Sequence, residues 1–136
     1  MIISTKGRYA LGILADLALL EDGKFASVKD ISENQKISLK YLESITASLH
    51  KAGFLESRRG RSGGYRLAKK PTDITLYSIF DSLEDSVSVA ACLDYEGVLC
   101  GREKHCAGYP LWEKLQKIVN DYLTGVTLED LLKGNI

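Results

Sequence analysis

Three cysteines in the second half of the chain are the residues best suited to chemistry. Cys92, Cys100 and Cys106 are separated by seven and five residues, in a stretch with two glycines, mixed charges and no hydrophobic periodicity, which predicts a loop. The spacing is too open for the CxxC pairs of a zinc ribbon, and a closed zinc site needs four ligands. Iron–sulfur clusters use thiolate ligands and also accept a non-cysteine ligand. The pattern alone is compatible with a cluster, with zinc or thiol redox chemistry, and with three unreactive cysteines.

A second candidate site is the stretch Arg58-Arg59-Gly60-Arg61-Ser62-Gly63-Gly64, in which three arginines are interleaved with three glycines. Glycines allow a backbone to approach a surface closely, and guanidinium groups bind phosphate well. The stretch forms the tip of a predicted two-stranded hairpin that follows Gly53. These residue types predict that the hairpin binds phosphate.

The hairpin is preceded by an amphipathic helix that Ser38 caps. The apolar side chains Leu39, Leu42, Ile45 and Leu49 recur every three or four residues, which predicts a buried face. The polar residues between them lie on the opposite face. We therefore expect a helix with a buried back and a hydrogen-bonding front.

Two further helices are predicted upstream. One covers residues 4–20 with Ser4 as its cap, and a short one runs from Ser27 to about Glu33, with Asp30 completing a capping box. Two helices joined by a tight turn and followed by a basic hairpin predict a winged helix-turn-helix, in which the second helix enters the DNA major groove and the wing grips the flanking backbone or minor groove. The predicted DNA contacts are Ser38, Lys40, Tyr41, Glu43, Ser44, Arg58, Arg59 and Arg61.

The rest of the chain predicts helices over residues 74–83, 110–125 and 127–132, the last opened by a capping box of Thr127 and Asp130. The expected fold class is therefore mainly α with a small β-hairpin wing, a winged helix-turn-helix plus a long C-terminal dimerisation helix. The long helix begins at Pro110 and carries an apolar stripe of Leu111, Leu115, Ile118, Val119 and Tyr122. So short a chain offers this stripe no obvious partner. Antiparallel pairing with a second copy would bury it, so we predict a homodimer with Leu111, Leu115, Ile118 and Tyr122 at its interface. A two-fold dimer suits a palindromic operator in double-stranded DNA.

Charge is divided unevenly along the 136 residues, although the net charge is zero. Residues 1–70 hold 13 Lys and Arg against 7 Asp and Glu, giving +6, whereas residues 71–136 hold 5 against 11, giving −6. We therefore expect a DNA-binding domain over residues 1–70 and a cysteine-loop sensor and dimerisation region over residues 71–136. The sequence has neither a long apolar run nor the pattern of a secretory signal, which predicts a cytoplasmic protein.

Several motifs together resemble one family. STKGRYAL, ISLKYLESITASLHKAGFLESRRGRSGGYRLA, and the cysteine loop followed by PLWEKL and TLEDLL are similar to the IscR/NsrR/CymR family of bacterial Rrf-type transcriptional regulators. The resemblance implies a homodimeric winged-helix repressor or activator in which Cys92, Cys100 and Cys106 hold a [2Fe–2S] or [4Fe–4S] cluster that tunes DNA affinity. It also implies sensing of redox state, iron–sulfur supply or nitric oxide.

Some positions depart from the family pattern. The histidine that follows the last cysteine in the biogenesis regulators is missing here, and Arg8 stands where some nitric-oxide sensors have a carboxylate. The candidates for a fourth ligand are His105, Glu103 and Asp94. Lys36 replaces a glycine that is common in the turn, which predicts a small local cost. The CymR-like members work without a cluster, through a partner protein, so a cluster-free regulator controlled by thiol state or by a partner is the alternative.

A small thiol redox enzyme is the competing class of function. Neither His50 nor His105 has an Asp or Asn at a spacing that would orient it, and no substrate-pocket motif accompanies the thiols. We therefore expect a regulator and not an enzyme.

Overall fold

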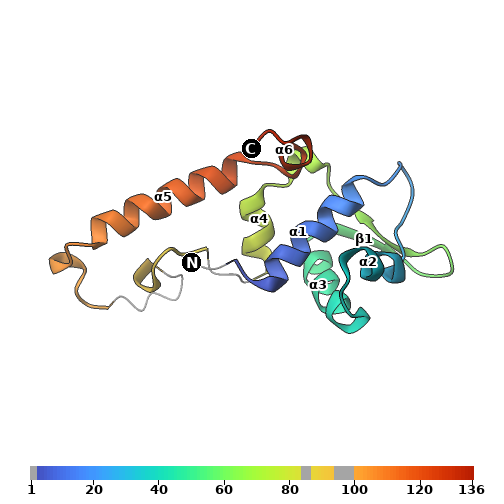
Figure 1. The fold of residues 1–136 in the computed structure, drawn as a ribbon, viewed down its shortest axis with the longest axis horizontal. Coiled ribbons are helices and arrows are strands. Elements are labelled where there is room, and N and C mark those ends of the chain that lie inside the picture. The colour runs from blue at the N-terminus through green and yellow to red at the C-terminus, as the bar shows by residue number, and fades with distance from the viewer. Residues whose placement is uncertain (1–2, 84–86, 94–99) are drawn as a thin grey trace.

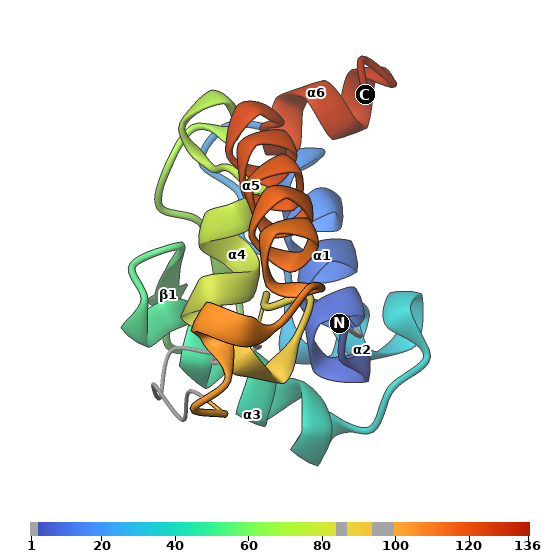
Figure 2. The same ribbon diagram turned by 90° about the vertical axis from the view of Figure 1, so that its left-hand side faces the viewer.

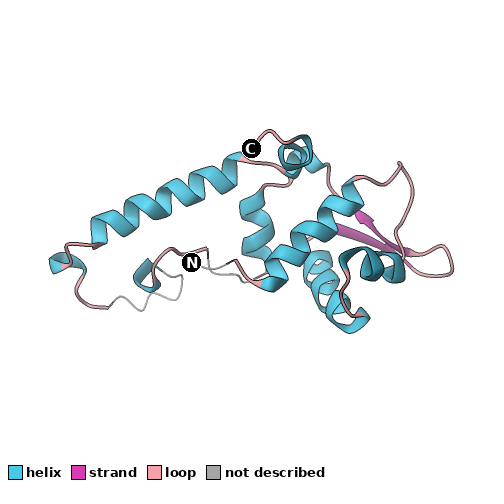
Figure 3. Cartoon of the chain, viewed as in Figure 1, coloured by secondary structure: helices cyan, strands magenta, loops and turns pink. Residues whose placement is uncertain are grey.

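The computed structural model describes residues 3–83, 87–93 and 100–136. Its first half contains α1 (Thr5–Ala18), α2 (Val28–Gln35) and α3 (Leu39–Lys51), followed by the hairpin of β1 (Leu55–Arg58) and β2 (Gly64–Leu67) (Figure 1). Colouring by secondary structure shows the two strands as the small β component of an otherwise helical chain (Figure 3). The predicted fold class is confirmed.

Each of the first three helices begins at a serine that acts as its N-cap. The hydroxyl oxygens of Ser4, Ser27 and Ser38 accept hydrogen bonds from backbone amides three residues later, at 2.9, 3.0 and 3.2 Å. Such a bond satisfies an amide that has no partner within the helix. At Ser27 the described contacts include only this half of the predicted capping box.

The turn between α2 and α3 depends on Lys36. Its φ of 54° and ψ of 45° lie in the left-handed region, which glycine adopts far more readily than a residue with a Cβ. Its backbone amide still closes the helix by donating to the carbonyl groups of Ser32 and Glu33. The conformation agrees with the predicted cost of replacing glycine here.

The wing hairpin is joined to the loop between α1 and α2. Its two strands pair antiparallel, with Arg58 opposite Gly64 and Leu55 opposite Leu67. Tyr65 in β2 also exchanges backbone hydrogen bonds of 2.8 and 2.9 Å with Ala26. The wing is therefore held by the helical body as well as by its own two strands.

The second half contains the 3₁₀ turn η1 (Pro71–Asp73), α4 (Leu76–Ser82), the turns η2 (Ala91–Leu93) and η3 (Glu103–His105), α5 (Tyr109–Gly125) and α6 (Leu128–Lys133). The helix predicted over residues 74–83 is shorter than expected because Thr75 caps it: the Thr75 hydroxyl accepts from the Ser78 amide at 3.1 Å. Within the described residues, no helix is both long and apolar enough to cross a membrane.

One buried core joins the two halves of the chain. Ile13 of α1, Ile45 of α3, Ile79 of α4 and Leu128 of α6 are all fully buried in it. The end view shows α4 next to α1 (Figure 2), and α4 also contacts α5. From this body, α5 extends away from the helix-turn-helix toward the other end of the molecule (Figure 1).

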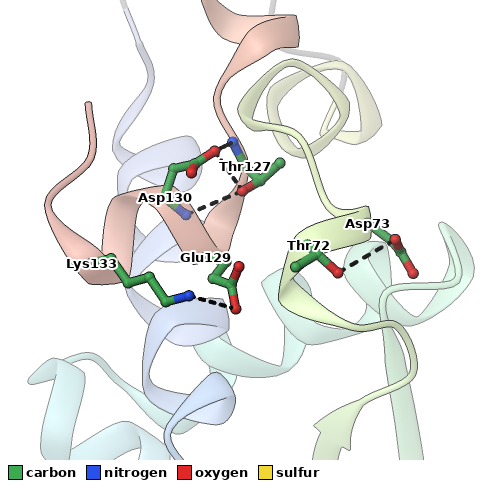
Figure 4. A network of polar contacts seen from close by, with 6 residues as sticks. All are labelled: Thr72, Asp73, Thr127, Glu129, Asp130 and Lys133. Atoms are coloured by element: carbon green, nitrogen blue, oxygen red, sulfur yellow. Dashed lines mark hydrogen bonds and ion pairs between the residues drawn. The ribbon is translucent and has the colours of Figure 1, made fainter.

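The start of α6 is fixed by a capping box, the motif predicted there. The Thr127 hydroxyl accepts from the Asp130 amide at 3.1 Å, and the Asp130 carboxylate accepts from the Thr127 amide at 3.0 Å and its hydroxyl at 2.7 Å (Figure 4). Hydrogen bonds from the Thr127 backbone and side chain lower the pKa of Asp130 below its ordinary value of 3.8. Backbone bonds from Leu76 to Val126 and from Leu128 to Ile74 tie this corner to the start of α4.

Two details of the predicted core are wrong. Leu39 is predicted on the buried face of α3, but 50% of its surface is exposed, at the first position of the helix. Val119 was expected in the outward stripe of α5, but it is half-buried and packs against the core. Leu42, Ile45 and Leu49 are fully buried as predicted.

Candidate DNA-binding surface and cysteine segment

The polar face of α3 points largely to solvent. Lys40, Glu43 and Ser44 are exposed, and so is Ser38, whose hydroxyl caps the helix. Tyr41 differs, because it is half-buried and its ring meets that of Tyr9 edge-on, with the centroids 5.8 Å apart. Four of the five predicted side chains on α3 are thus accessible, and the fifth is fixed in place by α1.

Behind the polar face of α3, one hydrogen bond lies within the helix and another joins it to α1. Thr46, on its buried face, donates a hydrogen bond of 3.0 Å to the carbonyl of Leu42 within the helix. The ammonium group of Lys6 on α1 donates to the Ser48 hydroxyl at 3.1 Å. This contact joins α1 to α3.

The three wing arginines are not equivalent. Arg59 and Arg61 are exposed, and neither has a hydrogen bond or ion pair to the described part of the chain. The guanidinium of Arg58 instead turns back across the hairpin, where its Nη2 donates to the Ser62 carbonyl at 2.9 Å. The same group lies 4.4 Å from the centroid of the Phe25 ring.

Phe25 is a residue of this surface that sequence reasoning missed. It lies in the loop between α1 and α2, directly before Ala26, and is half-buried. The guanidinium of Arg66 is 4.6 Å from its ring centroid and also pairs with the Glu56 carboxylate at 2.7 Å. The sequence gives one signal for Phe25. It is a single aromatic residue that lies between Gly23-Lys24 and a capping serine, outside any helical stripe.

The three cysteine thiols are free. Cys92 in η2 and Cys106 after η3 are half-buried, and Cys100 is exposed. His105 is exposed in η3, while Asp94 and the side chain of Glu103 lie outside what the structure describes. Among the described residues, no group of three or more His, Cys, Asp or Glu side chains is gathered closely enough to hold a metal ion. The three unpaired thiols are the type of donor that iron–sulfur ligation uses, and a fourth ligand is needed to complete such a site.

Gln116, in the middle of α5, holds the segment that leads to Cys92. Its side-chain oxygen accepts from the Val89 amide at 2.8 Å, and its nitrogen donates to the Val87 carbonyl and to Asn120, both at 2.9 Å. Sequence reasoning missed Gln116 as well, since its partners are backbone groups nearly thirty positions away. The bonds connect the backbone just before the first cysteine to the long helix.

The predicted dimer stripe on α5 is exposed in the single chain. Leu111, Leu115, Ile118 and Tyr122 expose 58%, 40%, 56% and 53% of their surface. They recur at intervals of four, three and four residues and so share one face of the helix. Side chains this apolar and this exposed along one face form a surface that association would bury.

Known proteins match the chain along almost its whole length. A family profile described as Rrf2, iron-dependent transcriptional regulator, matches residues 3–134. The HTH-type transcriptional regulator IscR of Aliivibrio salmonicida is 37% identical over 135 residues, covering 99% of this chain and 79% of that protein.

Solved structures agree with this relationship. CymR (YrzC), the global cysteine regulator of B. subtilis, has a TM-score of 0.78 at 35% identity, covering 98% of this chain and 97% of that one. The IscR of T. potens has a TM-score of 0.75 at 33% identity, covering 100% and 89%.

These relatives are regulators of transcription and not enzymes, as expected from the helix-turn-helix, the wing and the lack of a catalytic constellation in the sequence. The profile covers both the DNA-binding elements and the long helix. The chain therefore belongs to the Rrf2 family of DNA-binding transcriptional regulators.

Proposed function

We propose that this protein is a cytoplasmic homodimer that binds a palindromic operator and changes its DNA affinity with the state of its three cysteines. The exposed polar face of α3 beside an arginine-bearing wing, on a chain of the Rrf2 family, is the observation that supports DNA binding most strongly. In winged helices the second helix enters the major groove while the wing meets the flanking backbone or minor groove.

The proposed contacts divide into two kinds. Ser38, Lys40, Tyr41, Glu43 and Ser44 on α3 face bases or the adjacent backbone, while Arg59 and Arg61 at the tip of the wing meet phosphate or the minor groove. A carboxylate such as that of Glu43 can accept from a cytosine amino group, but it repels phosphate. Arg59 contributes positive charge to any sequence, since phosphates carry no sequence information.

Two variants separate these roles. Arg59→Ala should weaken binding to specific and random duplexes alike and reduce the slope of log affinity against log salt by about 1. Glu43→Ala should relax the consensus recovered by binding-site selection more than it lowers affinity. An unchanged salt slope would remove Arg59 from the interface, and an unchanged consensus would remove Glu43 from base recognition.

The exposed stripe on α5 supports the homodimer. Pairing two such helices about a two-fold axis would bury Leu111, Leu115, Ile118 and Tyr122 of both copies. The same axis would place two copies of α3 on half-sites about one helical turn apart or a multiple of it.

The cysteines are the proposed sensing site. Cys92, Cys100 and Cys106 would hold an iron–sulfur cluster, with His105 as a candidate for the fourth ligand. A bound cluster supplies a centre that gains or loses electrons and that is lost when iron or sulfide is scarce. The chain supplies three thiols on a glycine-containing segment and, through the IscR relatives, a family context for iron dependence.

Gln116 provides a route from this segment to the dimer helix. Its hydrogen bonds hold Val87 and Val89 against the middle of α5, and Cys92 follows Val89 by three residues. A displacement of Cys92 would therefore be transmitted to the helix that carries the dimer stripe. A coupling of about 1–3 kcal/mol between the two sites would change operator affinity by about 5- to 150-fold.

Anaerobic reconstitution with iron and sulfide tests this function. Wild-type protein should become coloured, and its operator affinity should differ with and without the chromophore. Each Cys→Ala variant should stay colourless and have the affinity of the stripped protein. Gln116→Leu, which cannot hold the Val87 and Val89 backbone groups, should take up the chromophore but show a smaller difference in affinity.

The likeness to CymR supports a second candidate, a regulator that works without a cluster. Its thiols, or a partner protein, would then set DNA affinity. Protein that stays colourless after reconstitution yet changes its operator affinity on thiol oxidation would favour this candidate. Protein that is coloured but binds its operator identically in both forms would contradict the coupling through α5.

A further inference from the structure

We propose that Phe25 and Arg58 together form a brace that holds the wing in its DNA-binding position, so that Arg58 acts through the wing instead of binding phosphate itself. The inference rests on the proposed use of the wing in DNA binding. It assigns a positioning role to a residue outside both the helix-turn-helix and the hairpin.

The tip of the wing has little to hold it rigid. Residues 59–63 connect two strands of only four residues each, and one backbone bond of 3.0 Å, from the Gly63 amide to the Gly60 carbonyl, crosses the tip. Gly60 has a φ of 107°, a conformation that glycine enters freely and also leaves freely. Ordering such a tip only on contact with DNA would reduce affinity, whereas a tip already in place avoids that loss.

The pleat of the hairpin brings three charged side chains to one face. Glu56 and Arg58 are two residues apart on β1 and so point the same way, and Arg66 lies opposite Glu56 on β2. Both guanidinium groups meet the Phe25 ring, at 4.4 and 4.6 Å from its centroid, which is within the range of cation–π attraction. Phe25 thus contacts one arginine from each strand of the wing.

The position of Phe25 is itself fixed by backbone contacts. The next residue, Ala26, exchanges two hydrogen bonds with Tyr65 of the wing. Gly64 allows this approach, because a Cβ there would lie 1.8 Å from the Ala26 carbonyl oxygen. The chain therefore carries the aromatic ring to the wing by a rigid connection.

Arg58 completes the brace from the side of the tip. Its guanidinium contacts Phe25 and also donates to the Ser62 carbonyl at 2.9 Å, which ties the far side of the tip to β1. A group engaged in both contacts is turned toward the hairpin. Arg59 and Arg61, which have no such contacts, are left to face the DNA.

Substitutions at Phe25 test the brace. Phe25→Leu keeps an apolar side chain but removes the π face, and we expect a several-fold loss of affinity for a labelled random-sequence duplex together with a several-fold faster exchange of the Gly63 amide in the free protein. Phe25→Trp restores a π face and should keep both values near wild type. Affinity unchanged in Phe25→Leu, or lost without faster Gly63 exchange, would overturn the proposal.

Arg58→Lys is a second test on an exposed residue that does not endanger the fold. Lysine keeps the charge but lacks the planar fork, so the brace predicts the same loss of affinity and the same faster exchange at Gly63. Direct phosphate binding by Arg58 instead predicts wild-type exchange at Gly63, since the free wing would be unaffected. Arg59→Lys is the matched control and should leave Gly63 exchange near the wild-type rate. Because exchange is measured without DNA, a failure of wing binding to DNA would be distinguished from a failure of the brace.

Discussion

The turn between α2 and α3 gives a quantitative test of how the helix-turn-helix is built. Among the described residues, Lys36 is the only one other than glycine with a positive φ. Its side chain is exposed, and its contribution to the turn is made by its backbone amide. Lys36→Gly therefore keeps the contacts of the turn and removes only the strain of a Cβ in the left-handed region.

The size of the effect follows from two opposing terms. Relief of the left-handed conformation contributes about 1–2 kcal/mol. The greater conformational freedom of glycine in the unfolded chain lowers the free energy of unfolding by about 0.5–1 kcal/mol. The net gain in the free energy of unfolding is about 0.5–1 kcal/mol, which for a chain of this length raises Tm by about 2–4 °C.

Thermal and urea unfolding of Lys36→Gly should show this gain, with Lys36→Ala as the control. Alanine removes the same charge but keeps a Cβ, so its stability should stay near that of wild type. If glycine proves no more stable than alanine, the strain assigned to this turn does not exist. The two variants should have equal DNA affinity, because both lack the Lys36 charge and differ only in backbone freedom.

Three further outcomes are expected. Gly64→Ala places a Cβ against the Ala26 carbonyl and should lower the free energy of unfolding by about 2–3 kcal/mol in urea titrations, with loss of protection at the wing amides. Ile118→Glu places a carboxylate in each copy of the proposed dimer contact, so sedimentation should show monomers, and an unchanged dimer would mean that the stripe is not the interface. For Asp130 the folded pKa lies below the unfolded value of 3.8, so its stabilisation is complete above that value and is lost as pH falls through the folded pKa. Asp130→Asn should therefore be less stable than wild type at neutral pH, and the difference should shrink in acid.

Local signals allowed most of the helices to be predicted. Ser4, Ser27, Ser38 and Thr127 cap helices where the sequence predicted caps, because a capping bond spans only three residues. The apolar spacing of α3 gave its buried face except at Leu39. That exception arises because periodicity tells which face of a helix is apolar and not how far the neighbouring elements reach along it.

The contacts that organise the two sites were harder to predict. Phe25 meets arginines more than thirty residues away, and Gln116 binds backbone groups of Val87 and Val89. Neither a contact between an aromatic ring and a distant arginine nor a bond from a side chain to a distant backbone group leaves a periodic pattern in the sequence. The division at residue 70 stays a prediction about function, as do the ligand roles of the cysteines, since a spacing of x7 and x5 fixes no distance between thiols.

The shared core has a consequence for how the protein is made. Leu128, near the end of the sequence, is fully buried in the same core as Ile13 and Leu14 of the first helix, and α6 packs against α1. During synthesis the apolar face of the first helix therefore stays incompletely covered until the segment around Leu128 has emerged from the ribosome. Contacts that span nearly the whole sequence are closed late and slow folding. A nascent chain stalled before α6 would be exposed to chaperones and proteases, so we expect the amount of active regulator to depend on synthesis of α6.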